Sequence, residues 1–501
     1  MNYDDEKRPP LIGRRELLAK AGVGAFGLLS GGLGAILPAA AKQRQAKGPV
    51  LSLDIACERD TWPIFPGAET FVERVEMSVR EGDASKLRAI PGSFAGPTIW
   101  VNKGDTVRAR MVNNLYQPTI LHWHGLVTDE HNDGLPNDAV ARGESYDYDF
   151  TVGNRAGTYW YHPHPDHYTG PQSYYGMSGI FVVCDRHEQS LSLPRGEYDL
   201  PLMIADKLVD ANNQLQYGSN PFVGTIGDQV FINGRPDFTI SAATRVYRLR
   251  LVNGSNARLY KLVWSNDLPL TVIGTDGGLL ERPVQKPYVM LGPGQRIELW
   301  ADFSDLPLGE SFKLRSLAFE GTAVGFEGSG IQNGTPIDVF SVRIDRQEPE
   351  TLTLPTTLAQ IQRYDKASAV NASHPRNFPI TFDGGFYFNH LTYEPGVVSK
   401  HEVVENNTLE CWEFSNRTGN IGIVHPIHIH GQSFQIYDRQ ILPEYRDAWE
   451  GVREGYVDEG WLDTFMLMPG ESAQLLLRFG PFKGLSLYHC HNLDHEDMGM
   501  M

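Results

Sequence analysis

A short β-strand pattern occurs three times along the chain and constrains its fold more than any other feature. Residues 107–113, 247–253 and 410–416 share an alternation of apolar and polar side chains, and each copy ends in Asn. A period of two is typical of a strand with one buried face. In each copy a second such strand follows later, running from a Gly-Glu or Gly-Gln turn to a Phe, at 143–150, 294–303 and 470–479. Two matched elements in the same order in three copies predict three similar β domains.

The 501 residues divide accordingly. We expect domains at 50–190, 191–345 and 377–501, with a proline-containing connecting segment at 346–376. Short strands separated by frequent turns, in a chain with 51 Gly and 32 Pro, favour Greek-key sandwiches over parallel α/β units. The predicted fold class is therefore all-β, with three Greek-key β-sandwich domains.

Residues 1–41 are predicted to be a removable export signal. Arg14 and Arg15 precede an apolar, glycine-rich stretch at 21–37, and three alanines at 39–41 supply the small residues of a cleavage site. The arginine pair resembles a twin-arginine signal. A membrane anchor is the alternative, which the glycines weaken because a stable span needs about 20 strongly apolar residues. We therefore expect a periplasmic protein that is not embedded in the membrane.

Charge and cysteine content exclude two broad classes. The formal net charge is −17, which argues against a nucleic-acid-binding surface. Four cysteines are too few for a disulfide scaffold. Cys57, Cys184 and Cys411 lie in apolar, strand-like runs and are expected to be buried thiols, although one disulfide among them stays possible in an oxidising compartment.

Histidine is concentrated in four short windows, 122–124, 162–164, 425–430 and 489–495, which hold ten of the 16 histidines. Residues i and i+2 of a strand point to the same face, so each His-x-His pair can direct two imidazoles one way. A lone pair of this kind is usually a surface feature. Four pairs supply eight imidazoles, too many for one copper or zinc ion, and predict a cluster of about three metal ions. The first and third domains hold two pairs each and the middle domain none, so we expect the outer domains to clamp the cluster between them.

A second metal site of a different kind is predicted around Cys490. Because it lies between His489 and His491, its sulfur faces the opposite side of the strand. Two histidines (His425 and His495), a thiolate and the weak thioether of Met500 are the ligands of a blue-copper electron-transfer site. Cys490 is covalently continuous with two histidines of the cluster, so an electron can pass between the sites through a few bonds.

These windows resemble the four copper motifs of the multicopper oxidases: LHWHGL at 121–126, WYHPH at 160–164, HPIHIH at 425–430 and HCHNLDHEDMGM at 489–500. The resemblance covers residues 50–501 and is strongest to bacterial three-domain laccases and bilirubin oxidases. It implies cupredoxin-like domains and four copper ions. The implied ligands are His425, Cys490, His495 and Met500 for type 1 copper; His122 and His428 for type 2; and His124, His162, His164, His430, His489 and His491 for the type 3 pair.

The resemblance also implies a laccase-type oxidoreductase. Substrate is oxidised one electron at a time at the type 1 copper, electrons pass through Cys490, and four of them reduce O2 to water at the trinuclear cluster. Asp133 and Glu496 match the positions of acidic proton donors in similar enzymes, with ordinary loop or surface charge as the alternative. Asp463 is expected to hydrogen-bond to a type 1 histidine.

The expected reductant is a small organic molecule: a phenol, an aromatic amine or a bilirubin-like compound. Relatives that oxidise Cu(I) carry a methionine-rich insert before the last domain, whereas residues 346–405 contain no methionine. A cuprous oxidase for copper tolerance is the alternative, and a non-catalytic scaffold is disfavoured by the complete ligand set. We expect His495 to present its ring edge to a surface pocket made mainly by the third domain, His167 to be a candidate substrate-side residue, and the protein to be a monomer.

Overall fold

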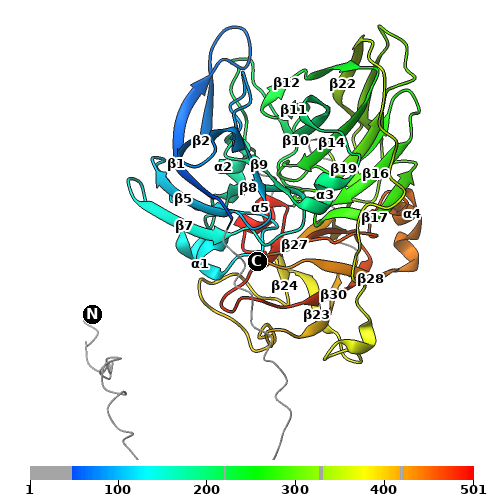
Figure 1. Ribbon diagram of the computed structural model, residues 1–501. Coiled ribbons are helices and arrows are strands. Elements are labelled where there is room, and N and C mark those ends of the chain that lie inside the picture. Colours follow the sequence, from blue (N-terminus) through cyan, green and yellow to red (C-terminus); the bar gives the residue numbers. More distant parts are fainter. Residues whose placement is uncertain (1–47, 219, 221, 326–330, 418, 420–421) are drawn as a thin grey trace, which may run out of the picture. The chain divides into compact units, whose positions relative to one another are not determined.

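The computed structural model describes residues 48–501 apart from 219, 221, 326–330, 418 and 420–421 (Figure 1). The predicted export signal at 1–41 lies outside the described residues. Across the described part of the chain, no helix has both the length and the apolar character that crossing a membrane requires.

The first domain is built from two sheets that enclose one apolar core. The sheets have the strand orders β2-β1-β5-β7 and β3-β4-β9-β8-β6. Their bounds are β1 Val50–Trp62, β2 Thr70–Glu81, β5 Thr106–Asn113, β7 Ser145–Thr151, β3 Leu87–Arg88, β4 Thr98–Asn102, β9 Gly179–Cys184, β8 Gly157–Pro163 and β6 Leu121–His122. Leu53 of β1 and Phe181 of β9 belong to the same buried cluster, so apolar faces of both sheets pack together.

The middle domain repeats this arrangement with larger sheets, ordered β12-β11-β10-β14-β19-β16-β17 and β13-β22-β20-β15-β18. The bounds are β12 Arg235–Pro236, β11 Gln229–Ile232, β10 Asp199–Lys207, β14 Val246–Asn253, β19 Arg296–Asp302, β16 Leu270–Thr275, β17 Gly278–Lys286, β13 Thr239–Ala243, β22 Ile337–Arg346, β20 Ser311–Ser316, β15 Tyr260–Trp264 and β18 Val289–Leu291.

The third domain has sheets ordered β24-β23-β25-β30-β28 and β29-β27-β31, and its strand β26 pairs with β21 from the middle part of the chain. The bounds are β24 Phe386–Phe388, β23 Arg376–Phe382, β25 Leu409–Ser415, β30 Glu471–Arg478, β28 Phe434–Ile441, β29 Thr464–Leu467, β27 His425–Ile429, β31 Tyr488–Cys490, β21 Ala323–Val324 and β26 Gly422–Ile423. Its buried core also takes in Val223, Leu259 and Met290, which lie among the strands and loops of the middle domain.

Helices are short and lie in the connections between strands. The α-helices are α1 Glu130–Asp133, α2 Thr169–Tyr175, α3 Arg186–Ser190, α4 Arg446–Arg453 and α5 Leu493–Asp497. The 3-10 turns are η1 Ala84–Lys86, η2 Pro136–Asp138, η3 Gly196–Tyr198, η4 Lys366–Ser368 and η5 Pro443–Tyr445. The all-β prediction with three sandwich domains is confirmed, while the predicted boundaries themselves stay predictions.

The repeated strands occupy the same place in each domain. Strands β5, β14 and β25 each lie between a parallel neighbour (β1, β10 or β23) and an antiparallel one (β7, β19 or β30). The carbonyl of the terminal Asn accepts a hydrogen bond from the glycine of the later turn, at 2.6, 2.9 and 2.7 Å for Asn113, Asn253 and Asn416. Those glycines, residues 143, 294 and 470, have φ of 83°, 83° and 77°, a region that glycine occupies without a Cβ clash. The positive φ explains why Gly recurs in all three copies. Asn recurs because its side-chain amide donates to two main-chain carbonyl oxygens in each copy.

Candidate metal centres

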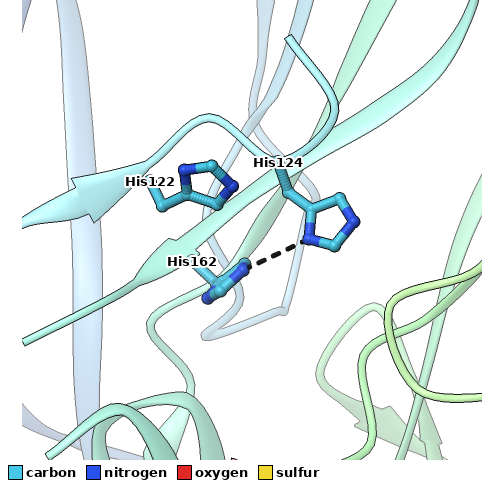
Figure 2. A group of neighbouring side chains, drawn as sticks. All are labelled: His122, His124 and His162. Atoms are coloured by element: carbon cyan, nitrogen blue, oxygen red, sulfur yellow. Dashed lines mark hydrogen bonds between the residues drawn. The ribbon is translucent and has the colours of Figure 1, made fainter. Parts of the chain in front are cut away.

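Eight of the histidines form one buried group between the first and third domains. They lie on four strands or within two residues of their ends: His122 and His124 at β6, His162 and His164 at β8, His428 and His430 at β27, and His489 and His491 at β31. None of the eight has exposed surface. Potential ligand atoms of His122, His124 and His162 all lie within 4.8 Å of one another, and Figure 2 shows these rings gathered at one place.

The two outer domains interleave their imidazoles. His122 of the first domain stacks on His430 of the third, with ring centroids 3.8 Å apart, and His124 stacks on His428 at 3.7 Å. His491 lies 4.9 Å from His124, again as a ring-centroid distance. The structure therefore brings together all eight imidazoles that the sequence pairs contribute, half from each domain.

Hydrogen bonds orient several of these rings. Carbonyl oxygens can only accept, so Nδ1 must donate in His122 (to Asp133 O, 2.7 Å) and in His428 (to Asp463 O, 2.8 Å). This leaves Nε2 of both rings as an unprotonated acceptor, and both atoms are buried with no hydrogen-bond partner. Buried polar atoms without partners are costly, which indicates a missing ligand at this place.

Electrostatics favour the neutral form that a metal requires. Burial lowers the pKa of His162 to about 3, and the neighbouring His164 contributes to this decrease. Burial also lowers the pKa of His164, to about 4. Neutral imidazoles offer lone pairs to a cation, and imidazole nitrogen is a preferred ligand of copper. The donor set and the orphaned nitrogens therefore fit copper.

A second buried group surrounds Cys490. Its sulfur lies 3.3 Å from His425 Nδ1 and 3.6 Å from His495 Nδ1, and the two Nδ1 atoms are 3.3 Å apart. Met500 is fully buried, and its main chain bonds to both Cys490 and His495. Burial raises the pKa of the Cys490 thiol well above its usual range, so a bound cation is needed to hold the thiolate. This group also fits copper.

Both predicted proton donors lie against the eight-histidine group. Asp133 Oδ2 is 2.8 Å from His430 Nδ1, and burial, assisted by Asp138 and Asp129, raises the pKa of Asp133 to about 8. Glu496 places its two oxygens 3.0 Å from His489 Nδ1 and 3.4 Å from His164 Nδ1. Asp133 is 5% exposed and Glu496 0%, so the surface-charge alternative is wrong for both.

Two expectations about the Cys490 group are wrong. Asp463 contacts His124 and His428 rather than a ligand of that group, because β29 pairs with β27 in a register that sets Thr464 opposite His428 and Leu467 opposite His425. His495 does not present its ring edge to a pocket of the third domain. It is fully buried, and its Nε2 lies 3.2 Å from the carbonyl oxygen of Phe222, in a segment of the middle domain.

The remaining sequence candidates have simpler environments. His167 is exposed, and its Nδ1 lies 2.7 Å from the main-chain oxygen of Asp497 in α5, the helix that carries His495. All four cysteines are free thiols. Cys57 and Cys411 are buried as expected and Cys184 is half-buried, so the alternative of a disulfide among them is wrong.

Three further residues, one from the middle domain and two from the third, contact the two groups directly or through Asp463, and sequence reasoning assigned them no role. Arg296, at the start of β19, pairs with both carboxylate oxygens of Asp463 at 2.6 and 2.5 Å. Asn492 donates its main-chain N–H to the sulfur of Cys490 at 3.4 Å, and Phe386 packs on the rings of His425 and His495. The only sequence signal for Arg296 is its place in the repeated turn.

Known proteins match both outer domains and the whole fold. Models of the multicopper oxidase family match residues 72–188 and 368–501. A multicopper oxidase of Staphylococcus aureus is 30% identical over 422 residues, 84% of each chain. A laccase of Bacillus stratosphericus is 28% identical, over 86% of this chain and 93% of its own. The crystal structure of the McoA multicopper oxidase from Aquifex aeolicus superposes with a TM-score of 0.77 at 30% identity, covering 91% of this chain and 95% of that one. The chain therefore belongs to the multicopper oxidase family of copper oxidoreductases, which use O2 as the electron acceptor.

Proposed function

We propose that this enzyme is a laccase-like oxidase with four copper ions, which takes electrons from small organic donors. The observation that carries the proposal is the pair of buried ligand groups joined through Cys490, whose sulfur belongs to one group while its chain neighbours His489 and His491 belong to the other. Such a pair separates electron entry from O2 reduction and connects the two by a few covalent bonds.

The proposed ligands follow the two groups. His425, Cys490, His495 and Met500 hold type 1 copper; His122 and His428 hold type 2 copper; His124, His162, His164, His430, His489 and His491 hold the type 3 pair. When bound, the copper ions accept electrons singly and reduce O2 with four of them. The orphaned Nε2 atoms of His122 and His428 support the type 2 assignment, since both rings are already fixed at Nδ1.

The protein's own part in the reaction includes holding protons beside the trinuclear site. The Asp133 carboxyl contacts His430, and its Oδ1 has no hydrogen-bond partner, so this oxygen is available to hold a proton. Glu496 bridges His164 and His489 on another side. We assign both as proton donors, because O2 reduction to water consumes four protons and positioned carboxyl groups are suitable sources. Burial opposes ionisation of Glu496, but His164 and His489 hold its pKa below the usual range, so it relays protons while Asp133 stores one.

Phenols and aromatic amines are the proposed donors, and cuprous ion is the competing substrate. The laccase relative and the absence of methionine from residues 346–405 support the organic donors. The test compares O2 uptake with a methoxyphenol and with Cu(I), each with and without added Cu(II). We expect sustained phenol oxidation without added Cu(II). Negligible phenol oxidation beside fast Cu(I) oxidation would contradict the assignment.

We also propose that residues 1–41 export the folded enzyme to the periplasm, where it acts as a monomer. The support is the Arg14-Arg15 pair before an apolar stretch. Replacing both arginines by lysine should retain the enzyme in the cytoplasm. Periplasmic activity equal to that of the unaltered protein would contradict this proposal.

A further inference from the structure

The middle copy of the repeated turn departs from the other two at one position. The turns read Gly143-Glu-Ser145, Gly294-Gln-Arg296 and Gly470-Glu-Ser472. The central residue makes the same hydrogen bond in each turn: its side-chain oxygen accepts from the main-chain N–H three residues earlier, at 3.0, 2.9 and 2.8 Å. The three turns can therefore be aligned residue by residue, and Arg296 occupies the position at which both outer domains have serine.

Arg296 joins the three domains at one point. The side chain belongs to the middle domain and is fully buried. Its guanidinium donates to both oxygens of Asp463 in the third domain, at 2.6 and 2.5 Å, and to the carbonyl of Thr158 in β8 of the first domain at 3.0 Å. Asp276 of the middle domain accepts from the Arg296 main-chain N–H at 2.7 Å and from the main-chain N–H of Asp463 at 3.2 Å.

Asp463 contacts His124, whose ring has the opposite orientation to the rings of three other histidines in the group. In His122, His162 and His428, Nδ1 donates to a main-chain carbonyl and Nε2 is left for the group. In His124 the order is opposite: Nε2 lies 3.1 Å from Asp463 Oδ1 and 3.2 Å from Thr464 Oγ1. Its Nδ1 instead faces His162 Nε2 at 3.4 Å, the contact drawn in Figure 2.

The rest of the middle-domain turn supports the same side of the group. A Cβ atom at Gly294 would lie 2.8 Å from the ring of His491, so the turn packs directly on that imidazole. Gln295 donates to the carbonyl oxygen of Thr464 at 3.1 Å. A domain without any predicted ligand thus contacts His491 directly and His124 through Asp463.

We propose that Arg296 is a positioning residue of the trinuclear copper site, through which the middle domain fixes the orientation of His124. The inference rests on the proposed copper ligands. A guanidinium that binds both carboxylate oxygens sets the plane of Asp463 and keeps Oδ1 toward His124. Oδ1 then accepts from Nε2–H, which selects the tautomer whose Nδ1 is free to bind copper. Serine at this position would be too short to reach Asp463.

The test compares Arg296→Met and Arg296→Lys with a matched control, Arg258→Met. Arg258 is also buried, lies in the middle domain and pairs with Asp206 at 2.9 Å, but its other recorded hydrogen bonds go to the carbonyls of Gly227 and Thr335. Copper-loaded enzymes are titrated with a copper chelator of known affinity. Copper per chain is followed by elemental analysis, type 1 copper by its blue absorption, and thermal stability by calorimetry.

In Arg296→Met we expect trinuclear copper to bind about 10- to 100-fold more weakly while the blue absorption persists. Arg296→Lys should lie in between, because lysine keeps the charge but loses the two-point contact. Arg258→Met should lower the unfolding temperature and leave copper affinity unchanged.

Equal copper affinity in Arg296→Met and Arg258→Met would overturn the inference and leave Arg296 a purely structural role. If Arg296→Met does not fold, the copper affinities of Arg296→Lys and Arg258→Lys are compared instead, and equal affinities would again overturn the inference. A wild-type enzyme that holds only type 1 copper would instead contradict the proposed function, so the two failures are distinguishable.

Discussion

Two aspartates make matching contacts with the eight-histidine group. Asp133, from the first domain, accepts from His122 with its carbonyl and contacts His430 of the third domain with its carboxylate. Asp463, from the third domain, accepts from His428 with its carbonyl and contacts His124 of the first domain with its carboxylate. Each aspartate therefore holds one ring of its own domain and one of the other.

The two differ in their counter-charge. Arg296 holds both oxygens of Asp463, whereas no Lys or Arg forms an ion pair with Asp133 among the residues that the structure describes. Burial raises the pKa of Asp133 to about 8, and Asp138 and Asp129 add to the shift. The same geometry thus serves two purposes: an ion-paired carboxylate that orients a ligand, and a carboxyl group that can carry a proton.

Breaking the ion pair should give the largest effect. Asp463→Asn leaves the buried Arg296 charge without its partner, and removing one member of such a pair costs about 3 kcal/mol of stability or more. Asp276 at 3.7 Å keeps the expected loss near the lower end of that range. Asp133→Asn, which breaks no Arg or Lys pair, should cost less than about 1.5 kcal/mol. Unfolding of both variants without copper measures the difference, and equal losses would show that the counter-charge does not distinguish the two sites.

The proton-donor side of the comparison predicts a loss of turnover. Asp133→Asn removes the carboxyl proton beside His430, and O2 reduction should slow by about 100-fold, the lower end of what general acid catalysis contributes. The blue absorption should persist, since Asp133 contacts the eight-histidine group and not Cys490. Stopped-flow reoxidation of the reduced enzyme by O2 measures this step directly. Unchanged reoxidation would remove Asp133 from the mechanism.

Lys207 is a buried cation whose neighbouring carboxylate does not offset the cost of burial, and its expected effect on stability is smaller. Lys207 is 3% exposed, and burial lowers its pKa to about 7 despite the opposing charge of Asp206. Between pH 7 and about 10.5, the unfolded chain binds more protons at this site than the folded one, so the Lys207 contribution makes stability rise with pH. Below pH 7 lysine is charged in both states and the full cost of burial applies.

The Lys207 contribution should amount to about 1 kcal/mol between pH 7.5 and 8.5. Lys207→Met should remove this part of the pH dependence, which denaturant unfolding at the two pH values measures. An identical pH dependence in the wild type and Lys207→Met would contradict the assigned shift.

The local sequence pattern was enough to predict the fold class and the clustering of the histidines, because both follow from strand periodicity. The i, i+2 spacing of His122 and His124 sets two side chains on one face of a strand, and the repeated Asn and Gly mark equivalent turns. These features depend on a few neighbouring residues, so they are visible without knowing how the domains dock.

Two of the residues that sequence reasoning missed act through contacts between domains. Arg296 reaches Asp463 across 167 positions of sequence, and Phe222 covers His495 across 273. The partner of Asp463 was predicted wrongly because the register of β29 against β27 decides it, and that register is not encoded in the short motif around residue 463. Docking and register are set by packing of whole sheets, which periodicity does not report.

The most direct test of the two joined copper groups is copper content and visible absorption, measured together for the wild type and Cys490→Ser. The account predicts about four copper ions per chain and a blue band in the wild type, and about three copper ions without the band in the variant, because only the type 1 ligand set loses its thiolate. Blue absorption that survives in Cys490→Ser, or a wild type with a single copper ion, would contradict it.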